Sequence, residues 1–324
     1  MPEPARDLAR ETIAPDERAV TAEFIAFLEQ VSASRHPTGQ IPRFNQGRHS
    51  GCVEAEFTVV GGLDRALAIG VFQRPQTYAA WIRFANASSA SDREKDVRGM
   101  AIKLRGVAGE NLTAGESTQD FVLNSHPVMM VPGTREFLEL LRASEAKGLR
   151  MARYFLTHPR AARIAFESRQ HHVSHLDIPY WSATPYLFGA GRAVKYIVRP
   201  AALVRSSKPA LSETYLHDEL RRRLSTGEVS FDFFVQFQRD VESMPIEDAS
   251  IEWKERHSPS VRVAQIHVPR QNIDVPGREL ACERISFNPW HCLAEHRPLG
   301  SMNRARQEIY TAMSKLRASR STDV

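Results

Sequence analysis

The sequence predicts an α+β fold in which an antiparallel β-sheet or barrel carries helices at the start, middle and end of the chain. Short apolar runs bounded by glycine, proline and serine clusters are typical of strands, and they fill the stretches 57–130 and 194–268. Apolar residues at helical spacing precede, separate and follow these stretches. Strands, helices, strands and a final helix in this order favour the α+β class.

The individual elements follow from local patterns. Residues 1–45 are expected to form a helical leader, with a helix over 20–31 that ends before the segment from Pro37 to Pro42. Thr134 is expected to cap a helix that ends at Gly148, and 46–324 is taken as one domain. The expected strands are 57–60, 66–72, 79–84, 99–104, 121–130, 194–198, 231–237 and 261–268, and the further helices are 151–165, 212–224 and about 301–318.

Composition excludes several classes of protein. With 324 residues, 42% of them hydrophobic, the chain is long enough for a large core. The net charge of +5 comes from basic residues interspersed with acidic ones, without stacking aromatics, so nucleic acid is not an expected partner. No run of about 18 apolar residues occurs, so no integral membrane segment is expected.

The cysteines and the N-terminus bear on location. Cys52, Cys282 and Cys292 are too few and too scattered for a disulfide framework. The first 20 residues lack the apolar core of a secretory signal. We therefore expect a cytoplasmic protein.

The last expected helix carries the most informative pattern. Arg306, Tyr310 and Arg317 lie at spacings of four and seven, so their side chains share one helix face. Guanidinium groups on both sides of a tyrosine favour its phenolate form. Because a phenolate is a known axial ligand of haem iron, Tyr310 is a candidate iron ligand.

Two further segments carry candidate catalytic groups. His49 lies in a glycine-rich entrance to a strand, where a rigidly held imidazole can move a proton between peroxide oxygens at neutral pH. Asn124 ends an apolar run before Pro127, and its amide is expected to enter the same cavity or to form a turn.

Arg83 and the segment 96–103 form another feature. Arg83 lies between apolar neighbours in a strand, where a guanidinium group needs an anionic partner such as a haem propionate. Asp96 and Arg98 are expected to pair with each other within a hairpin turn.

Together these segments resemble the catalase superfamily. The matching motifs occur in order: His49, Arg83-Phe84, the Asp-x-Arg-Gly-x-Ala-x-Lys motif at 96–103, Asn-x-x-Pro at 124–127, Phe-Asn-Pro at 287–289, and the Arg-x-x-x-Tyr pattern of Arg306, Tyr310 and Arg317. The resemblance implies an antiparallel β-barrel with N-terminal, inserted and C-terminal helices, in which residues 46–324 form a haem domain and the helix at about 301–318 is proximal to the haem.

The resemblance also implies roles for single residues. Tyr310 would bind the iron of haem b and Arg306 would hydrogen-bond its phenolate. His49 and Asn124 would form the distal catalytic pair, while Arg83 would meet a propionate. Phe137 would stack on the haem, and Arg317 would complete the haem-binding set.

Three positions depart from the family pattern. Gln46 stands where the family has an arginine that binds a propionate, for which Arg43 or Arg48 would substitute. Ala85 replaces the serine that supports the distal histidine. The phenylalanine pair after Asn-x-x-Pro is Met129-Met130 here, which suits an organic peroxide.

The expected function is a haem-dependent peroxidase or weak catalase acting on hydrogen peroxide or organic hydroperoxides. One alternative is a fatty-acid hydroperoxide isomerase or lyase, for which a lipid hydroperoxide is the substrate. Another is a non-catalytic haem carrier or sensor. The oligomeric state stays open, with a homo-oligomer reached through the N-terminal helix as one alternative.

Two other segments contain residue types that can bind a metal ion or haem. His171, His172 and His175 have metal-ligand character, but a polar surface turn is favoured because no cysteine or carboxylate set accompanies them. Cys292 is a conceivable haem ligand, but it is expected to be a buried small apolar residue.

Overall fold

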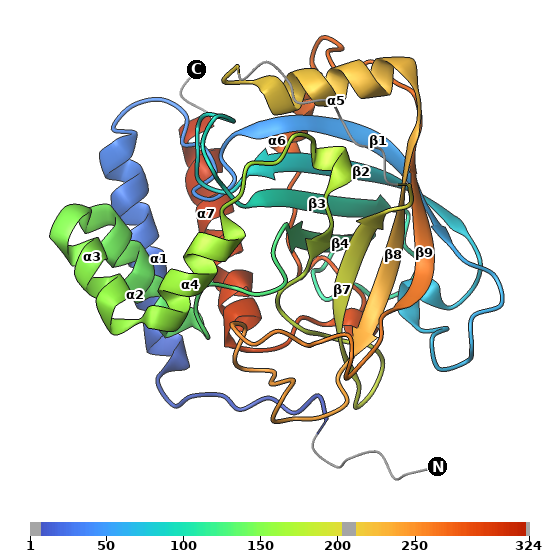
Figure 1. Ribbon diagram of the computed structural model, residues 1–324, viewed down its shortest axis with the longest axis horizontal. Helices are drawn as coiled ribbons and strands as arrows, with labels where there is room; N and C mark the ends of the chain where they lie inside the picture. Colours follow the sequence, from blue (N-terminus) through green and yellow to red (C-terminus); the bar gives the residue numbers. More distant parts are fainter. Residues whose placement is uncertain (1–7, 203–211, 322–324) are drawn as a thin grey trace.

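A closed antiparallel β-barrel forms the centre of the protein (Figure 1). The computed structural model describes residues 8–202 and 212–321. In them, eight strands follow one another in the order β5-β4-β3-β2-β1-β9-β8-β7, and β5 closes the ring by pairing with β7. The predicted α+β fold with an antiparallel barrel is confirmed. The strands are β1 (His49–Val59), β2 (Thr77–Asn86), β3 (Arg98–Arg105), β4 (Thr118–Asn124), β5 (Tyr180–Trp181), β7 (Ala193–Pro200), β8 (Val229–Phe237) and β9 (Val261–Val268), with β6 (Tyr186–Leu187) added to β7.

Helices pack against the outside of the barrel. Figure 1 shows α7 between the barrel and the group α1 to α4, while α5 lies across β1. Among the described residues, none of these helices combines the length and apolar composition needed to cross a membrane. The helices are α1 (Glu17–Arg35), α2 (Thr134–Ala146), α3 (Gly148–Thr157), α4 (Pro159–Ser168), α5 (Tyr215–Thr226), α6 (Arg278–Arg284) and α7 (Ser301–Ser321), with 3-10 turns η1 (Gly70–Phe72), η2 (His175–Asp177) and η3 (Ala294–His296).

The barrel interior is a packed aromatic core. Successive side chains of a strand point to opposite faces, so in β1 the buried Phe57 alternates with exposed Glu56 and Thr58. The Phe57 ring lies 5.1 Å from Phe233 and 5.9 Å from Phe121, measured between centroids. Since side chains fill the inside, the outer faces of the strands are left for a functional site.

Several local predictions were wrong for identifiable reasons. The segment 66–72 forms turns and η1 instead of a strand, because the backbone N–H of Val71 bonds to Nε2 of buried His296. The helix predicted over 151–165 is divided at Pro159, which lacks the N–H needed to continue α3. Thr134 is the first residue of α2 and its buried hydroxyl has no partner, so Gly133 occupies the cap position.

Helix α1 is part of the helical layer. Its Phe24 and Leu28 share an apolar cluster with Leu138 of α2 and Met313 of α7. Phe24 also meets Phe137 edge-on, with ring centroids 5.7 Å apart. The helix of the predicted leader therefore packs against the side of α7 that faces away from the barrel.

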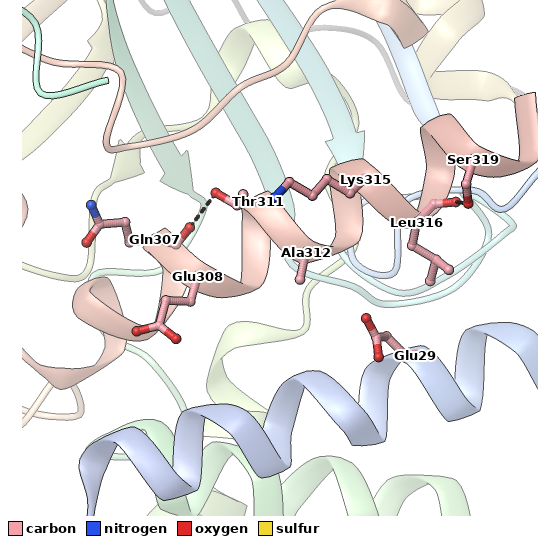
Figure 2. A pocket seen from close by; sticks show the side chains of 8 residues that line it. All are labelled: Glu29, Gln307, Glu308, Thr311, Ala312, Lys315, Leu316 and Ser319. Carbon is pink, nitrogen blue, oxygen red and sulfur yellow. Dashed lines mark hydrogen bonds between the residues drawn. The ribbon is translucent and has the colours of Figure 1, made fainter. Parts of the chain in front are cut away.

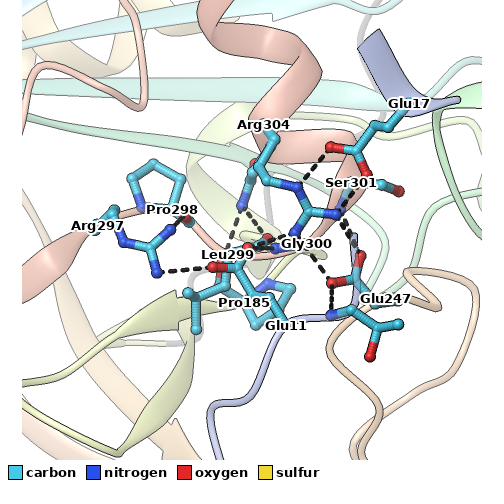
Figure 3. Close-up of polar contacts among 12 residues, drawn as sticks. Glu11, Glu17, Pro185, Glu247, Arg297, Pro298, Leu299, Gly300, Ser301 and Arg304 are labelled. Carbon is cyan, nitrogen blue, oxygen red and sulfur yellow. Dashed lines mark hydrogen bonds and ion pairs between the residues drawn. The ribbon is translucent and has the colours of Figure 1, made fainter. Parts of the chain in front are cut away.

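A charged cluster fixes the N-terminus of α7 (Figure 3). The guanidinium group of Arg304 donates to Glu17 at 2.6 Å, to Glu11 at 2.5 Å and to Glu247 at 3.0 Å. Glu11 also accepts from the backbone N–H of Gly300 at 2.9 Å, and Glu247 accepts from that of Ser301 at 2.8 Å. These carboxylates satisfy amides at the start of α7, where negative charge is favourable.

The Arg304 cluster yields a stability prediction. Arg304→Ala leaves three carboxylates that are 12 to 28% exposed facing one another, so we expect the free energy of unfolding to fall by about 3–5 kcal/mol. Arg142→Ala is the matched control, because its pair with Glu23 is about half exposed and worth about 1 kcal/mol or less. Equal losses in denaturant titrations of both variants would contradict this account.

The same cluster yields a pH prediction. Burial raises the pKa of Glu11, but hydrogen bonds from Gly300, Arg297 and Arg304 outweigh it and hold that pKa below its ordinary value of 4.5. A carboxyl with a lowered pKa stabilises the fold fully above pH 4.5 and loses this contribution as the pH falls through its folded pKa. Acid unfolding of a Glu11→Gln variant should therefore be less steep than that of the parent protein below pH 4.5.

Candidate functional site on the outer face of the barrel

One row of residues crosses four strands on the outer face of the barrel. The register pairs His49 of β1 with Ala85 of β2, Ala85 with Gly99 of β3, and Gly99 with Asn124 of β4. Directly opposed residues of antiparallel strands point to the same face. His49 and Asn124 therefore flank a floor made of alanine and glycine, about 14 Å apart by three strand spacings.

The floor is partly covered by Gln46. A Cβ added to Gly99 would lie 2.3 Å from the Gln46 amide nitrogen, so the glutamine side chain rests on this glycine. The backbone of Gln46 has a positive φ of 55° and its carbonyl accepts from Nη2 of Arg83 at 2.8 Å. Gln46 thus lines the predicted site through its side chain and positions Arg83 through its backbone.

The Asn124 amide is oriented by a turn. Its Oδ1 accepts from the backbone N–H of His126 at 3.0 Å, which is the turn expected of Asn124 in the segment before Pro127. This bond uses the acceptor side of the amide. The Nδ2 donor is the part of the side chain that remains for a ligand.

His49 has one nitrogen without a partner. The side chain is 14% exposed, its Nε2 lies 3.4 Å from Oε1 of Glu283, and its Nδ1 is buried without a hydrogen bond. The residue opposite His49 is Ala85, whose methyl side chain cannot form a hydrogen bond with it. Burial and then the charge of Arg83 lower the pKa of His49 from 6.5, against the opposing charges of Glu283 and Glu279.

Two arginines contact a single carboxylate beside His49, and the charge of a third arginine interacts with it. Glu283 of α6 lies 2.7 Å from Nη1 of Arg43 and 3.3 Å from Nη2 of Arg83. Arg83 is 2% exposed and its Nε has no partner, and burial, then Arg43, lower its pKa to about 10. The pKa of Arg317 is likewise lowered by burial and by Arg43. The structure therefore brings His49 and Arg83 of the predicted set together around Glu283, and Arg317 lies within electrostatic reach of them. We refer to this group, whose excess positive charge favours an anion, as the anion-binding cluster.

The remaining predicted residues lie further along α7 and on α2. Tyr310 is half-buried and close enough to Tyr186 to affect the pKa of that phenol, which burial raises to about 12. Arg306 donates through Nη1 to Asn303 at 3.0 Å and to Thr184 at 3.3 Å. Phe137 is half-buried among apolar residues shared by α1, α2 and α7.

Helix α7 also borders a groove on another of its faces (Figure 2). An open groove of about 730 Å³ lies between α1 and α7, and Figure 2 shows its polar lining. Arg306, Tyr310 and Arg317 do not line it. The lining residues are Glu29, Gln307, Glu308, Thr311, Ala312, Lys315, Leu316 and Ser319.

The expected pairing of Asp96 with Arg98 was wrong. Asp96 accepts from the backbone N–H groups of Ser88 and Ser89, both at 2.8 Å. Fully buried Arg98 instead donates to the Asn86 side chain and to the carbonyl of Glu94. The carboxylate of Asp96 and the guanidinium group of Arg98 thus bind different parts of the connection between β2 and β3. These contacts stabilise the strand ends that carry Ala85 and Gly99.

The expected polar surface turn at 171–175 holds for the exposed His171 but was wrong for His175. His175 is 1% exposed, and its two nitrogens lie 3.0 Å from the Tyr180 hydroxyl and 2.9 Å from the Ser50 hydroxyl. Burial holds the pKa of His175 well below 6.5. This neutral histidine therefore braces the residue next to His49 and leaves no role as a metal ligand.

Sequence reasoning missed two features of the site. Cys52 and Cys282 form a disulfide although 230 residues separate them, and no spacing rule indicates such a pair. Glu283 stands next to Cys282 in a mostly exposed polar segment that carries no pattern. The third cysteine, Cys292, is a buried free thiol as expected.

The chain was compared with known proteins. No protein-family model matches it. A catalase-related peroxidase of Mycolicibacterium paratuberculosis is 28% identical over 257 residues, which cover 74% of this chain and 78% of that protein.

Solved catalases share the fold along most of the chain. Catalase A from Saccharomyces cerevisiae aligns with a TM-score of 0.69 and 16% identity over 98% of this chain. A bacterial catalase aligns with a TM-score of 0.68 and a fungal catalase with 0.67, each at 14% identity and covering 98% and 89% of this chain. The alignments span 61 to 68% of those catalases, so this chain is shorter.

The closed barrel with its surrounding helices, the ordered motifs and these likenesses agree with one another. The chain therefore has the fold of the catalases.

Proposed function

We propose that this protein is a haem-dependent peroxidase or weak catalase that cleaves hydrogen peroxide or organic hydroperoxides. The observation that carries the proposal is the row from His49 to Asn124, with an acid–base group and an amide donor on either side of a floor of small residues. The likeness to a catalase-related peroxidase supports the reaction class.

The residues present suit haem b. Arg43 and Arg83 contact one carboxylate and Arg317 lies within electrostatic reach of it, so the cluster has excess positive charge for the two propionates of the cofactor. The buried Nε of Arg83 has no hydrogen-bond partner and could donate to a propionate. Tyr310 would bind the iron, Arg306 would support its phenolate, and Phe137 would contact the ring.

The protein's own groups then have defined tasks. Bound haem would supply the redox-active iron at which the peroxide bond is cleaved. Nε2 of His49 takes a proton from one peroxide oxygen and returns it to the leaving oxygen. The lowered pKa keeps this imidazole neutral at pH 7 and able to accept that proton. Nδ2 of Asn124 donates a hydrogen bond that orients the peroxide.

A fatty-acid hydroperoxide isomerase or lyase is the second candidate. Met129, Met130 and Phe137 pack together in one apolar cluster that follows Asn124 along the chain. Methionine side chains adapt to irregular apolar ligands, so this apolar cluster would favour an organic hydroperoxide over hydrogen peroxide as the substrate. Product analysis with a fatty-acid hydroperoxide separates the two candidates, because isomerisation yields no reduced alcohol and needs no electron donor.

The proposal is tested first at His49. His49→Ala should lower kcat for peroxide by about 10²–10⁴-fold while the haem content stays unchanged, because the variant removes the proton-transfer group only. The exposed His257→Ala is the control and should keep full activity. If the parent protein binds haem but turns over no peroxide, the hypothesis of a non-catalytic haem carrier replaces the hypothesis of a peroxidase.

Ala85→Ser should raise turnover. The register places position 85 opposite His49, whose Nδ1 has no partner, so a hydroxyl there would hold the imidazole in one orientation. A net hydrogen bond of about 0.5–1.5 kcal/mol corresponds to a gain of about twofold to tenfold in kcat/KM. Ala101→Ser adds the same hydroxyl opposite Arg83 and should give no gain. A gain in both variants, or in neither, would show that Nδ1 is not limiting.

The charge of Glu283 should be visible in the titration of His49. Since Glu283 raises the pKa of His49 against burial and Arg83, Glu283→Gln should lower that pKa further in the haem-free protein. NMR titration of the imidazole gives the value, and His49→Gln assigns the resonance. Glu279→Gln should act in the same direction but less strongly. An upward shift in either variant would contradict the described electrostatics.

A further inference from the structure

The Cys52–Cys282 disulfide joins helix α6 to the barrel at the candidate site. Cys52 lies in β1 directly opposite Arg83 of β2. Cys282 lies in α6, with its Cα 6.0 Å from that of Cys52. The bond therefore fixes α6 beside the buried guanidinium group of Arg83.

Few apolar contacts hold α6 in place, and its other contacts are polar. Cys282 is the one buried residue of this seven-residue helix, and Leu280 is 54% exposed. So short a helix is not stable without tertiary contacts. The Arg278 side chain adds a contact 5.6 Å from the centroid of the Trp81 ring and a hydrogen bond to Gln271. The disulfide is thus the covalent link between α6 and the barrel, and Cys282 also supplies the buried side chain of this helix.

The residue after Cys282 occupies the anion-binding cluster. One oxygen of Glu283 meets Arg43, and the other lies 3.3 Å from Arg83 and 3.4 Å from Nε2 of His49. Arg43 also donates to the backbone carbonyls of Glu283 and Ile285. The carboxylate of Glu283 therefore sits on the arginines that a ligand's carboxylate would need.

A metal ion is the competing occupant. His49, Cys282 and Glu283 place one nitrogen, sulfur or oxygen atom each within 4.8 Å of one another, the one such group among the described residues. The sulfur of Cys282 is bonded to Cys52 and offers no thiolate while the disulfide is formed. However, Arg43 and Arg83 contact the same carboxylate, and two guanidinium groups repel a cation. The cluster therefore favours an anion.

We propose that the Cys52–Cys282 disulfide is a redox latch that keeps Glu283 seated on Arg43 and Arg83 and so closes the site to carboxylate ligands. The inference rests on the proposed function, in which haem propionates are those ligands. In the open form α6 moves away, Glu283 leaves the arginines, and a carboxylate from the ligand takes its place.

The redox step uses reactants of stated classes. A hydroperoxide oxidises one thiol to a sulfenic acid and leaves as an alcohol, and the second thiol then displaces water to form the disulfide. A dithiol reverses this by thiol–disulfide exchange and becomes a cyclic disulfide. Peroxide, the proposed substrate, thus closes the latch, and a dithiol opens it.

The latch is tested without haem by hydrogen exchange. In a Cys292→Ser background, which removes the third thiol, amides of residues 278–286 should exchange at least about tenfold faster after dithiol reduction. Strand β9 should keep its protection and report that the barrel remains folded. Unchanged exchange in 278–286 would overturn the proposal whether or not the protein binds haem.

Haem uptake supplies the second readout. Stopped-flow absorption should show haemin binding to the reduced protein about tenfold faster than to the oxidised protein, a factor that corresponds to about 1.4 kcal/mol. Cys52→Ser with Cys282→Ser should match the reduced protein under oxidising conditions, and dithiol reduction of the parent covers the case that this variant folds poorly. Equal or slower uptake by the reduced protein contradicts the latch.

Glu283→Gln separates the carboxylate from the tether. Because this variant lacks the competing charge, it should bind haemin quickly in both redox states. A persistent redox dependence in Glu283→Gln would assign the effect to α6 alone and overturn the role of the carboxylate. If no form binds haemin, the proposed function fails, while hydrogen exchange still decides whether the disulfide holds α6.

Discussion

The structure depends on closure of the sheet through β5, a strand of two residues. Trp181 pairs with Asn124 of β4 on one side and with Ile197 of β7 on the other. Once the ring is closed, the interior is filled with aromatic side chains, so any ligand must bind outside. Asn124 belongs both to this closing pair and to the row that begins at His49. Barrel closure and the candidate site therefore share a residue.

The second constraint is electrostatic. Arg43 and Arg83 contact one carboxylate near His49, and Arg317 lies within electrostatic reach of it. The burial of Arg83 and Arg317 makes this excess positive charge costly unless an anion enters. The protein meets this cost with Glu283, supplied by a short helix tied down by a disulfide. In the proposed function, an anionic cofactor would compete with the carboxylate of Glu283 for the same guanidinium groups, and loading of the site would become a point of control.

Sequence analysis succeeded where a pattern is local. Alternation in Val229–Phe237 and Val261–Val268 located β8 and β9, and helical spacing located α7 with its row of Arg306, Tyr310 and Arg317. It failed where a distant partner decides. His175 is buried because Ser50 and Tyr180 satisfy both of its nitrogens, and the Cys52–Cys282 bond spans 230 residues.

The most direct test of the account is an absorption spectrum of the purified protein supplied with haemin, beside that of Tyr310→Phe. The account predicts a strong Soret band in the parent protein and a shifted or lost band in the variant, since phenylalanine cannot bind iron. Identical spectra would exclude Tyr310 as the ligand. A parent protein with no Soret band after haemin is supplied would contradict the haem-enzyme proposal as a whole.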